Sequence, residues 1–148
     1  MARRYTVHGQ GDVGTTKTVL GLTGATTVRP KIYDIVVGCA ATPADVGSQF
    51  QLWRYTAAGT STATYIIPLD PGDPASLCAS GENHSGEPTY TANKGLAAFS
   101  INQRNTFRWV AAPGGELVIP ATANNGIGLM TKASGGTALH EATFFFEE

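Results

Sequence analysis

The stretch NQRNTFRWVAAPGGELVIP, from Asn102 to Pro120, decides the fold. In its first half Phe107 and Trp109 alternate with Arg108, and a period of two is typical of a half-buried strand. The pattern places the two aromatic side chains toward a core and the arginine on the opposite face. The Pro-Gly-Gly break at 113–115 allows a chain reversal, and a second apolar run follows it. The stretch therefore predicts a β-hairpin.

Similar short extended runs, separated by turn residues, fill most of the chain. The strongest in the N-terminal half is Lys31 to Ala41, in which Ile35 and Val37 lie on an apolar face. The runs that predict strands are residues 3–8, 17–22, 31–41, 48–56, 65–69, 96–102, 105–112, 116–121, 127–133 and 137–148. The fold class is therefore all-β: an antiparallel β-sandwich or jelly roll of about 8–10 short strands with little helix.

The whole chain, residues 1–148, is predicted to form a single β-sandwich domain. Residues 1–15 are interpreted as an N-terminal arm, with a short leading strand at 3–8 as the alternative. The region from Asp70 to Pro88 has the weakest strand pattern. Within it, residues 74–79 could start one short helix at a proline, and residues 80–88 are predicted to be an exposed loop.

Composition and charge exclude several classes of protein. Charged residues make up 14% of the chain, below the usual fraction of about 25%, which leaves more surface for contact with other proteins. The formal net charge of −1, with no basic run longer than Arg3-Arg4, excludes a nucleic-acid binder. No apolar stretch reaches the roughly 18 residues of a membrane span, and no secretory signal is present, so we expect a chain made and used without export.

The histidines and cysteines give no metal or disulfide pattern. His8, His84 and His140 stand far apart in the sequence, which argues against a metal site of the cupin type, and His140 is expected to lie beside apolar residues with its ring satisfied. Cys39 lies in an apolar strand and Cys78 in a loop-like region. Two cysteines without a secretory signal favour free thiols over a disulfide.

Other residues of chemical interest have simpler structural readings. Asp70 and Asp73 lie in a Gly/Pro turn and are interpreted as turn formers rather than calcium ligands. Trp53, Tyr55 and Trp109 could form an aromatic platform for a sugar, but such residues are more often core or interface anchors. No nucleotide-binding loop or nucleophile motif is present, so we predict no catalytic, cofactor or metal site and a protein that is not an enzyme.

The last predicted strand is apolar on both of its faces near its end. Phe144 and Phe146 share one face, and Phe145 lies on the other. A core accounts for one of these faces. The other requires a second subunit, a partner or a loop of the same chain to cover it.

Several of these segments together resemble small structural proteins of tailed bacteriophages. They are the apolar strand after Arg29-Pro30, TPAD at 42–45, TAAGTST at 56–62, NQR at 102–104, FRW at 107–109, PGGEL at 113–117 and the terminal FEE. In these features the chain is similar to capsid decoration (cement) proteins, from about Arg29 to the C-terminus. The resemblance implies a jelly-roll-like β-sandwich, commonly trimeric, on the outer surface of the phage head.

The resemblance leads to a functional expectation. The chain is expected to be a structural virion protein, made in the host cytoplasm, that binds the major capsid protein on the outside of the capsid as a homotrimer, without nucleic acid or membrane. Arg3, Arg4 and Tyr5 are the hypothetical capsid contacts, and Phe144, Phe145 and Phe146 are the hypothetical subunit interface. The alternative is a tail- or fibre-associated module that binds a receptor or carbohydrate.

Overall fold

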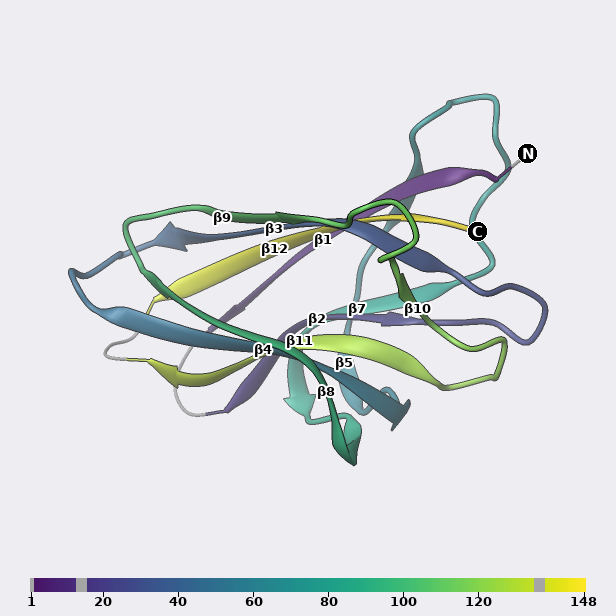
Figure 1. Cartoon of the computed structure of the whole chain (residues 1–148). Helices are drawn as coiled ribbons and strands as arrows, with labels where there is room; N and C mark the ends of the chain where they lie inside the picture. Colours follow the sequence, from purple (N-terminus) through teal and green to yellow (C-terminus); the bar gives the residue numbers. More distant parts are fainter. Residues whose placement is uncertain (1, 13–15, 135–137) are drawn as a thin grey trace.

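The computed structural model describes residues 2–12, 16–134 and 138–148 and consists of two layers of antiparallel strands (Figure 1). Sheet A contains β1 (Arg4–Asp12), β3 (Lys31–Ala41), β6 (Ile66–Pro68), β9 (Phe107–Val110), β10 (Leu117–Val118) and β12 (Leu139–Glu147). Sheet B contains β2 (Lys17–Thr23), β4 (Gly47–Ala57), β5 (Thr60–Ala63), β7 (Ala79–Gly86), β8 (Thr89–Asn102) and β11 (Gly126–Ser134). The described residues contain no helix. The predicted all-β antiparallel sandwich is confirmed.

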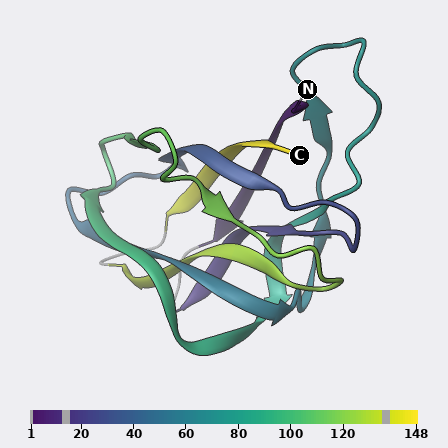
Figure 2. The same ribbon diagram turned by 45° about the vertical axis from the view of Figure 1, so that its right-hand side comes forward.

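The strand order places the two ends of the chain side by side. In sheet A the order is β10-β3-β12-β1-β6, and in sheet B it is β5-β7-β2-β11-β4-β8. The first and last strands pair from Arg4 opposite Glu147 to Asp12 opposite Leu139. The segment between β6 and β7 stands out from the body beside the N-terminus (Figure 2).

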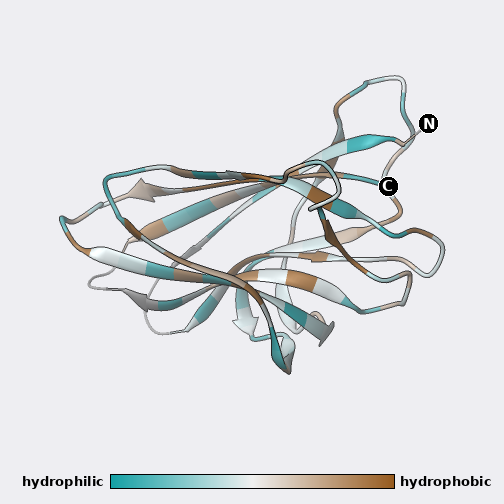
Figure 3. Ribbon diagram, viewed as in Figure 1, coloured by the Kyte–Doolittle hydropathy of each residue, from teal (hydrophilic) through white to brown (hydrophobic). Residues whose placement is uncertain are grey.

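The core lies between the sheets and draws alternate residues from both. Hydrophobic and hydrophilic segments alternate along the strands of both layers (Figure 3). Strand alternation was enough to predict that Ile35 and Val37 of β3 face the core, and both are fully buried. Tyr5 and Val7 of β1 are fully buried as well. The other members of the buried cluster are Val19, Leu20, Leu22, Ile32, Phe50, Leu52, Ile119, Ile127, Leu129, Ala142, Phe144 and Phe146.

The predicted N-terminal arm at residues 1–15 is wrong for the residues that the structure describes. β1 is an inner strand of sheet A, paired with β12 on one side and β6 on the other. The backbones of Arg3 and Glu148 extend this pairing with two further hydrogen bonds of 3.0 Å each. The alternative of a leading strand is the correct one, because Tyr5 and Val7 bury their side chains in the core. Residues 1 and 13–15 of the predicted arm lie outside the described part of the chain.

The predicted hairpin at 102–120 is also wrong, although both of its strands exist. β9 pairs with β3 from Phe107 opposite Val37 to Val110 opposite Asp34, and β10 then pairs with the next residues of the same strand, Leu117 opposite Ile32. β9 and β10 are therefore two pieces of one interrupted edge strand that run in the same direction along β3. The Pro-Gly-Gly segment forms an excursion between them, closed by a hydrogen bond from Gly115 N to Ala112 O at 2.8 Å.

The polar segment predicted as a loop at 80–88 forms most of a strand instead. β7, with the sequence ASGENHSG, lies between β5 and β2 inside sheet B. Its inner position buries Gly81 and His84, although it contains no β-branched or large apolar residue. The predicted short helix at 74–79 is absent: these residues lead from the loop into β7.

His140 of β12 is buried without the polar partner that we expected for it. Its ring is fully buried and lies edge-on to Phe50, with the ring centroids 5.0 Å apart. Among the described residues, neither ring nitrogen has a hydrogen-bond partner. Burial therefore lowers the pKa of His140, because the charged ring would lose its hydration.

This burial predicts loss of stability in mild acid. Below a pH of about 6.5 the unfolded chain takes up a proton on this histidine while the folded chain does not, so the free energy of unfolding falls by up to about 1.4 kcal/mol per pH unit. We expect His140→Leu to reduce this slope in urea titrations between pH 7 and 5. His84, whose pKa burial also lowers, contributes a slope of its own. His8→Gln, at an exposed position, is the control, and an unchanged slope in His140→Leu would contradict the prediction.

Candidate interaction surface

The six predicted contact residues divide between the core and the surface of sheet A. Tyr5, Phe144 and Phe146 are fully buried, and Tyr5 stacks on Phe146 with the ring centroids 5.5 Å apart. Tyr5 as a capsid contact, and Phe144 and Phe146 as a subunit interface, are therefore wrong, because strand alternation turns these side chains into the core. Phe145 is half-buried and Arg4 is exposed, both on the outer face of sheet A. Arg3 is exposed just before β1.

The edge of sheet A at β6 exposes a row of large apolar side chains. Tyr65, Ile67 and Leu69 occupy alternate positions, so they share one face, while Ile66 turns to the core. Their exposed fractions, with that of Leu77 in the following loop, are Tyr65 84%, Ile67 49%, Leu69 47% and Leu77 61%. We call Tyr65, Ile67 and Leu69 the β6 surface.

Strand register connects the β6 surface with Phe145. Ile67 lies opposite Thr6, and Thr6 lies opposite Phe145 on its other side. Phe145 in turn lies opposite Asp34, and Asp34 opposite Val110, which is 56% exposed. Directly paired residues point to the same face, so Ile67, Phe145 and Val110 alternate with Thr6 and Asp34 across the outer face of sheet A.

Most charges near this row are paired with a neighbour. Arg108 donates to both carboxylate oxygens of the buried Asp34, from Nε at 3.0 Å and from Nη2 at 2.5 Å. These bonds raise the pKa of Arg108. Lys31 Nζ lies 3.2 Å from Glu147 Oε1 at the other end of the strands. The Arg4 guanidinium lies over the ring of Tyr33, 5.8 Å from its centroid. The face therefore combines apolar groups with charges that are largely neutralised by neighbours.

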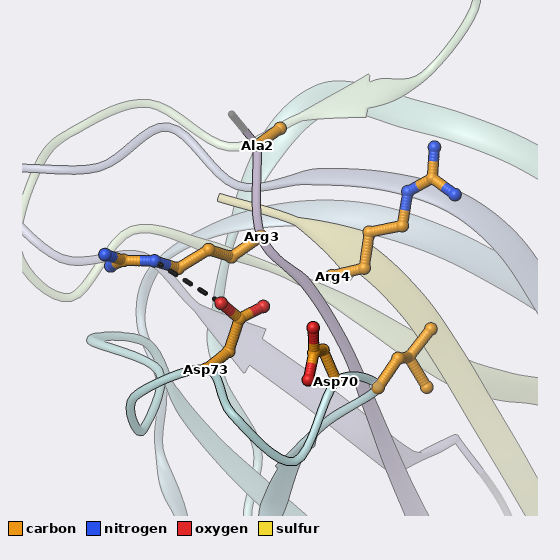
Figure 4. Close-up of a pocket in the computed structure, with 6 residues that line it drawn as sticks. Ala2, Arg3, Arg4, Asp70 and Asp73 are labelled. Atoms are coloured by element: carbon orange, nitrogen blue, oxygen red, sulfur yellow. Dashed lines mark ion pairs between the residues drawn. The ribbon is translucent and has the colours of Figure 1, made fainter.

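Arg3 and Arg4 line a hollow beside the β6 surface, with a volume of about 660 Å³ (Figure 4). Leu69, Asp70 and Asp73 form the other side of this hollow. Arg3 Nε lies 3.9 Å from Asp73 Oδ1, whereas the Arg4 side chain points away from both aspartates. Two of the three predicted capsid contacts therefore lie next to the exposed apolar row.

The two aspartates act as turn formers, as predicted. Asp70 Oδ1 accepts the Gly72 N–H at 2.8 Å, and Asp70 O accepts the Asp73 N–H at 3.0 Å. This is the hydrogen bonding of an aspartate-initiated turn. Within residues 2–12, 16–134 and 138–148, no three His, Cys, Asp or Glu side chains are grouped so that they could hold a metal ion.

The loop that carries Leu77 is held in place by the two ends of the chain. The Glu148 carboxylate accepts hydrogen bonds from Ser76 Oγ at 2.8 Å, Leu77 N at 3.2 Å and Cys78 Sγ at 3.3 Å. Tyr5 donates its hydroxyl to Pro74 O at 3.2 Å. A loop fixed in this way loses little conformational freedom on binding, so more of its contact energy contributes to affinity.

Both cysteines are free, as predicted. Burial, together with the hydrogen bond to Glu148, raises the pKa of Cys78 to about 12. Cys78 is therefore a neutral thiol at physiological pH, and its contact with Glu148 serves to anchor the loop.

A hydrogen-bonded polar cluster on the outer face of sheet B was not predicted from the sequence. Glu87 accepts three hydrogen bonds from Thr18, two from its backbone N–H at 3.0 and 3.1 Å and one from its hydroxyl at 2.5 Å. Tyr90 hydrogen-bonds the same hydroxyl at 2.6 Å, and His84 Nδ1 donates to Thr18 O at 3.2 Å. Burial raises the pKa of the Tyr90 phenol. These polar groups hydrogen-bond one another, so the cluster links the start of β8 to β2.

The three residues of the predicted aromatic platform are not brought together. Trp109 lines a crevice between the sheets, and Tyr55 is buried with its hydroxyl 2.8 Å from Thr23 Oγ1. Trp53 lies half-buried over Gly95, and its indole N–H donates to Gln51 Oε1 at 2.8 Å. Trp53 faces a separate hollow on the outside of sheet B, of about 260 Å³.

Among the described residues no helix is long and apolar enough to cross a membrane. Comparison of the chain with family models, with curated proteins and with solved structures gives no match.

Proposed function

We propose that this chain is a structural virion protein that binds the outer surface of a phage capsid and stabilises the head, as a homotrimer. Its partner in this proposal is the major capsid protein, and it acts by adhesion, without catalysis. It would be made in the host cytoplasm and reside on the surface of the virion. Two observations support the proposal: the resemblance of the sequence to capsid decoration proteins, and the apolar side chains exposed on sheet A.

The observation that carries the proposal is the β6 surface. Three large apolar side chains are exposed on one face along β6, next to Arg3 and Arg4, and Leu77 is exposed in the loop that follows. Such patches are typical of surfaces that contact other proteins. The loop under Leu77 is anchored in advance by Tyr5 and Glu148, as a rigid binding surface requires.

The mechanism follows from mass action. Each copy contributes binding energy only to the assembled shell, so binding favours that shell over its expanded or ruptured forms. The binding energies of many copies that bridge neighbouring capsomers would add together. A low fraction of charged residues reduces the cost of removing water from the contact surfaces.

Electron cryo-microscopy of virions of the encoding phage tests the proposal directly. We expect density for this two-sheet domain on the head, at hundreds of copies, and co-sedimentation of the purified chain with heads that lack it. Light scattering of the purified chain should give the mass of a trimer. A chain found only on the tail, or a strict monomer at high concentration with no affinity for heads, would contradict the proposal.

The hollow beside Trp53 favours the alternative of a carbohydrate-binding tail module. An exposed indole face next to an amide side chain is a common arrangement for stacking on a sugar ring, and Gln51 supplies that amide here. Binding to a glycan array that is lost in Trp53→Ala would favour this second function. A glycan signal unchanged in Trp53→Ala would remove it.

A further inference from the structure

The crevice that Trp109 lines lies between the two sheets, at the side where β8 faces β9. Its volume is about 230 Å³. Ile35 and Leu52 form its floor and are buried in the core. Phe107, Trp109 and Leu117 form its walls and are half-buried. The crevice therefore runs from solvent down to the centre of the sandwich.

The entrance stays open because a small residue occupies it. Ala97 of β8 lies opposite Leu52 of β4, so its methyl group points to the inner side of sheet B. An inward-pointing residue of a sandwich is normally covered by the other sheet, yet Ala97 is exposed. Ser100 of the same strand lies opposite Gln49, points to the outer side and does not line the crevice.

The apolar lining of the crevice disfavours charged ligands. All of the lining side chains are hydrocarbon, apart from the indole N–H of Trp109. A charged ligand would give up its hydration here without receiving an ion pair or several hydrogen bonds in return. Water is also poorly held, because a bound water needs two to four polar partners. The crevice therefore favours neutral, apolar groups.

Volume then limits the size of the occupant. An apolar cavity of about 150 Å³ accommodates benzene, whereas typical drug-sized pockets start at about 300 Å³. The crevice falls between these sizes, which corresponds to one ring or two fused rings. Phe99 and Phe107 stack at one end with ring centroids 4.2 Å apart, so their pair can be extended by another flat ring.

We propose that this crevice is a binding site for a neutral aromatic molecule of one or two fused rings. The ring enters past Ala97, rests on Leu52 and Ile35, and contacts the indole of Trp109. The site is independent of the β6 surface and of the proposed role in the virion.

Titration of the ¹⁵N-labelled chain with indole tests the site. The indole N–H signal of Trp109 is expected to shift in a saturable way, while that of Trp53, on the outside of sheet B, stays in place. Trp53→Phe assigns the two signals. Indole-3-carboxylate has the same ring system with an added charge and should bind at least about tenfold more weakly.

Two matched variants of β8 complete the test. Ala97→Phe fills the entrance and should weaken indole binding by at least about tenfold, whereas Ser100→Phe places the same ring at an exposed position that does not line the crevice and should leave binding unchanged. Ala97→Met serves as a second blocking variant should the phenylalanine disturb the fold, which near-ultraviolet circular dichroism reports. No saturable shift of Trp109 at millimolar indole, or equal binding in the Ala97 and Ser100 variants, would overturn the proposal.

Discussion

Phe144→Ala is expected to lower the free energy of unfolding by about 3–5 kcal/mol, whereas Phe145→Ala should lower it by no more than about 1 kcal/mol. The two residues are neighbours in β12, but they point to opposite sides of sheet A. Phe144 is fully buried and lies between Val7 and Ile35, both members of the core. Its removal would leave a cavity that the surrounding strands cannot fill.

Phe145 has no comparable surroundings. It is half-buried and lies between Thr6 and Asp34 on the outer face. Urea denaturation of the two variants, followed by tryptophan fluorescence, measures the difference. Equal losses of stability would contradict the placement of these side chains and would reopen the question of which face of β12 meets the core.

The double substitution Ile67→Asp with Leu69→Asp is expected to reduce binding to phage heads by at least about 100-fold, with little effect on folding. Central apolar residues of an interface often contribute about 2 kcal/mol or more each, and a buried unpaired carboxylate adds a further penalty. Both side chains are about half exposed in the free chain, so folding does not depend on their burial. Quantitative co-sedimentation with heads measures the loss.

A control with the same change in charge separates a specific contact from general repulsion. Ala92→Asp with Ala98→Asp adds two carboxylates at exposed positions of β8, in the other sheet. We expect this control to bind heads as the unmodified chain does. If both double variants lose binding equally, the β6 surface is not the contact. If neither loses binding, the capsid contact lies elsewhere.

Side-chain alternation predicted the parts of the fold that depend on local pattern. It placed Ile35 with Val37, and Phe107 with Trp109, on inward faces, and both expectations are confirmed. It also separated Phe145 from its two neighbours. Apolar residues at every second position predict the inward face of a strand wherever that face packs against a core.

The local pattern could not predict which strands pair with each other. The predicted hairpin is wrong because β9 and β10 each pair with β3, which has a long apolar face, and not with each other. β7 was missed because an inner strand can be built from small and polar residues when its neighbours supply the apolar groups. Its residues are poor strand formers by themselves, and only the sheet context makes them strand.

The interaction surface was predicted only in part, for a similar reason. Arg3, Arg4 and Phe145 were proposed for chemical reasons and do lie on or beside the outer side of sheet A. The β6 surface was overlooked, since the run at 65–69 was predicted only as a short strand, with no assignment of which of its side chains face solvent. Exposure of Tyr65 and Leu77 depends on the absence of a covering element within the described chain, and no local pattern encodes that.

The short and interrupted edges of sheet A limit association of copies through their backbones. An unpaired strand edge offers backbone groups to other chains and so promotes uncontrolled polymerisation by strand addition. Here one edge is divided into β9, of four residues, and β10, of two, with the Pro-Gly-Gly excursion between them. The opposite edge, β6, has three residues and ends in Pro68. Neither edge of this sheet therefore offers a long run of backbone groups with which a second copy could pair. Contacts made by sheet A would then depend on its side chains.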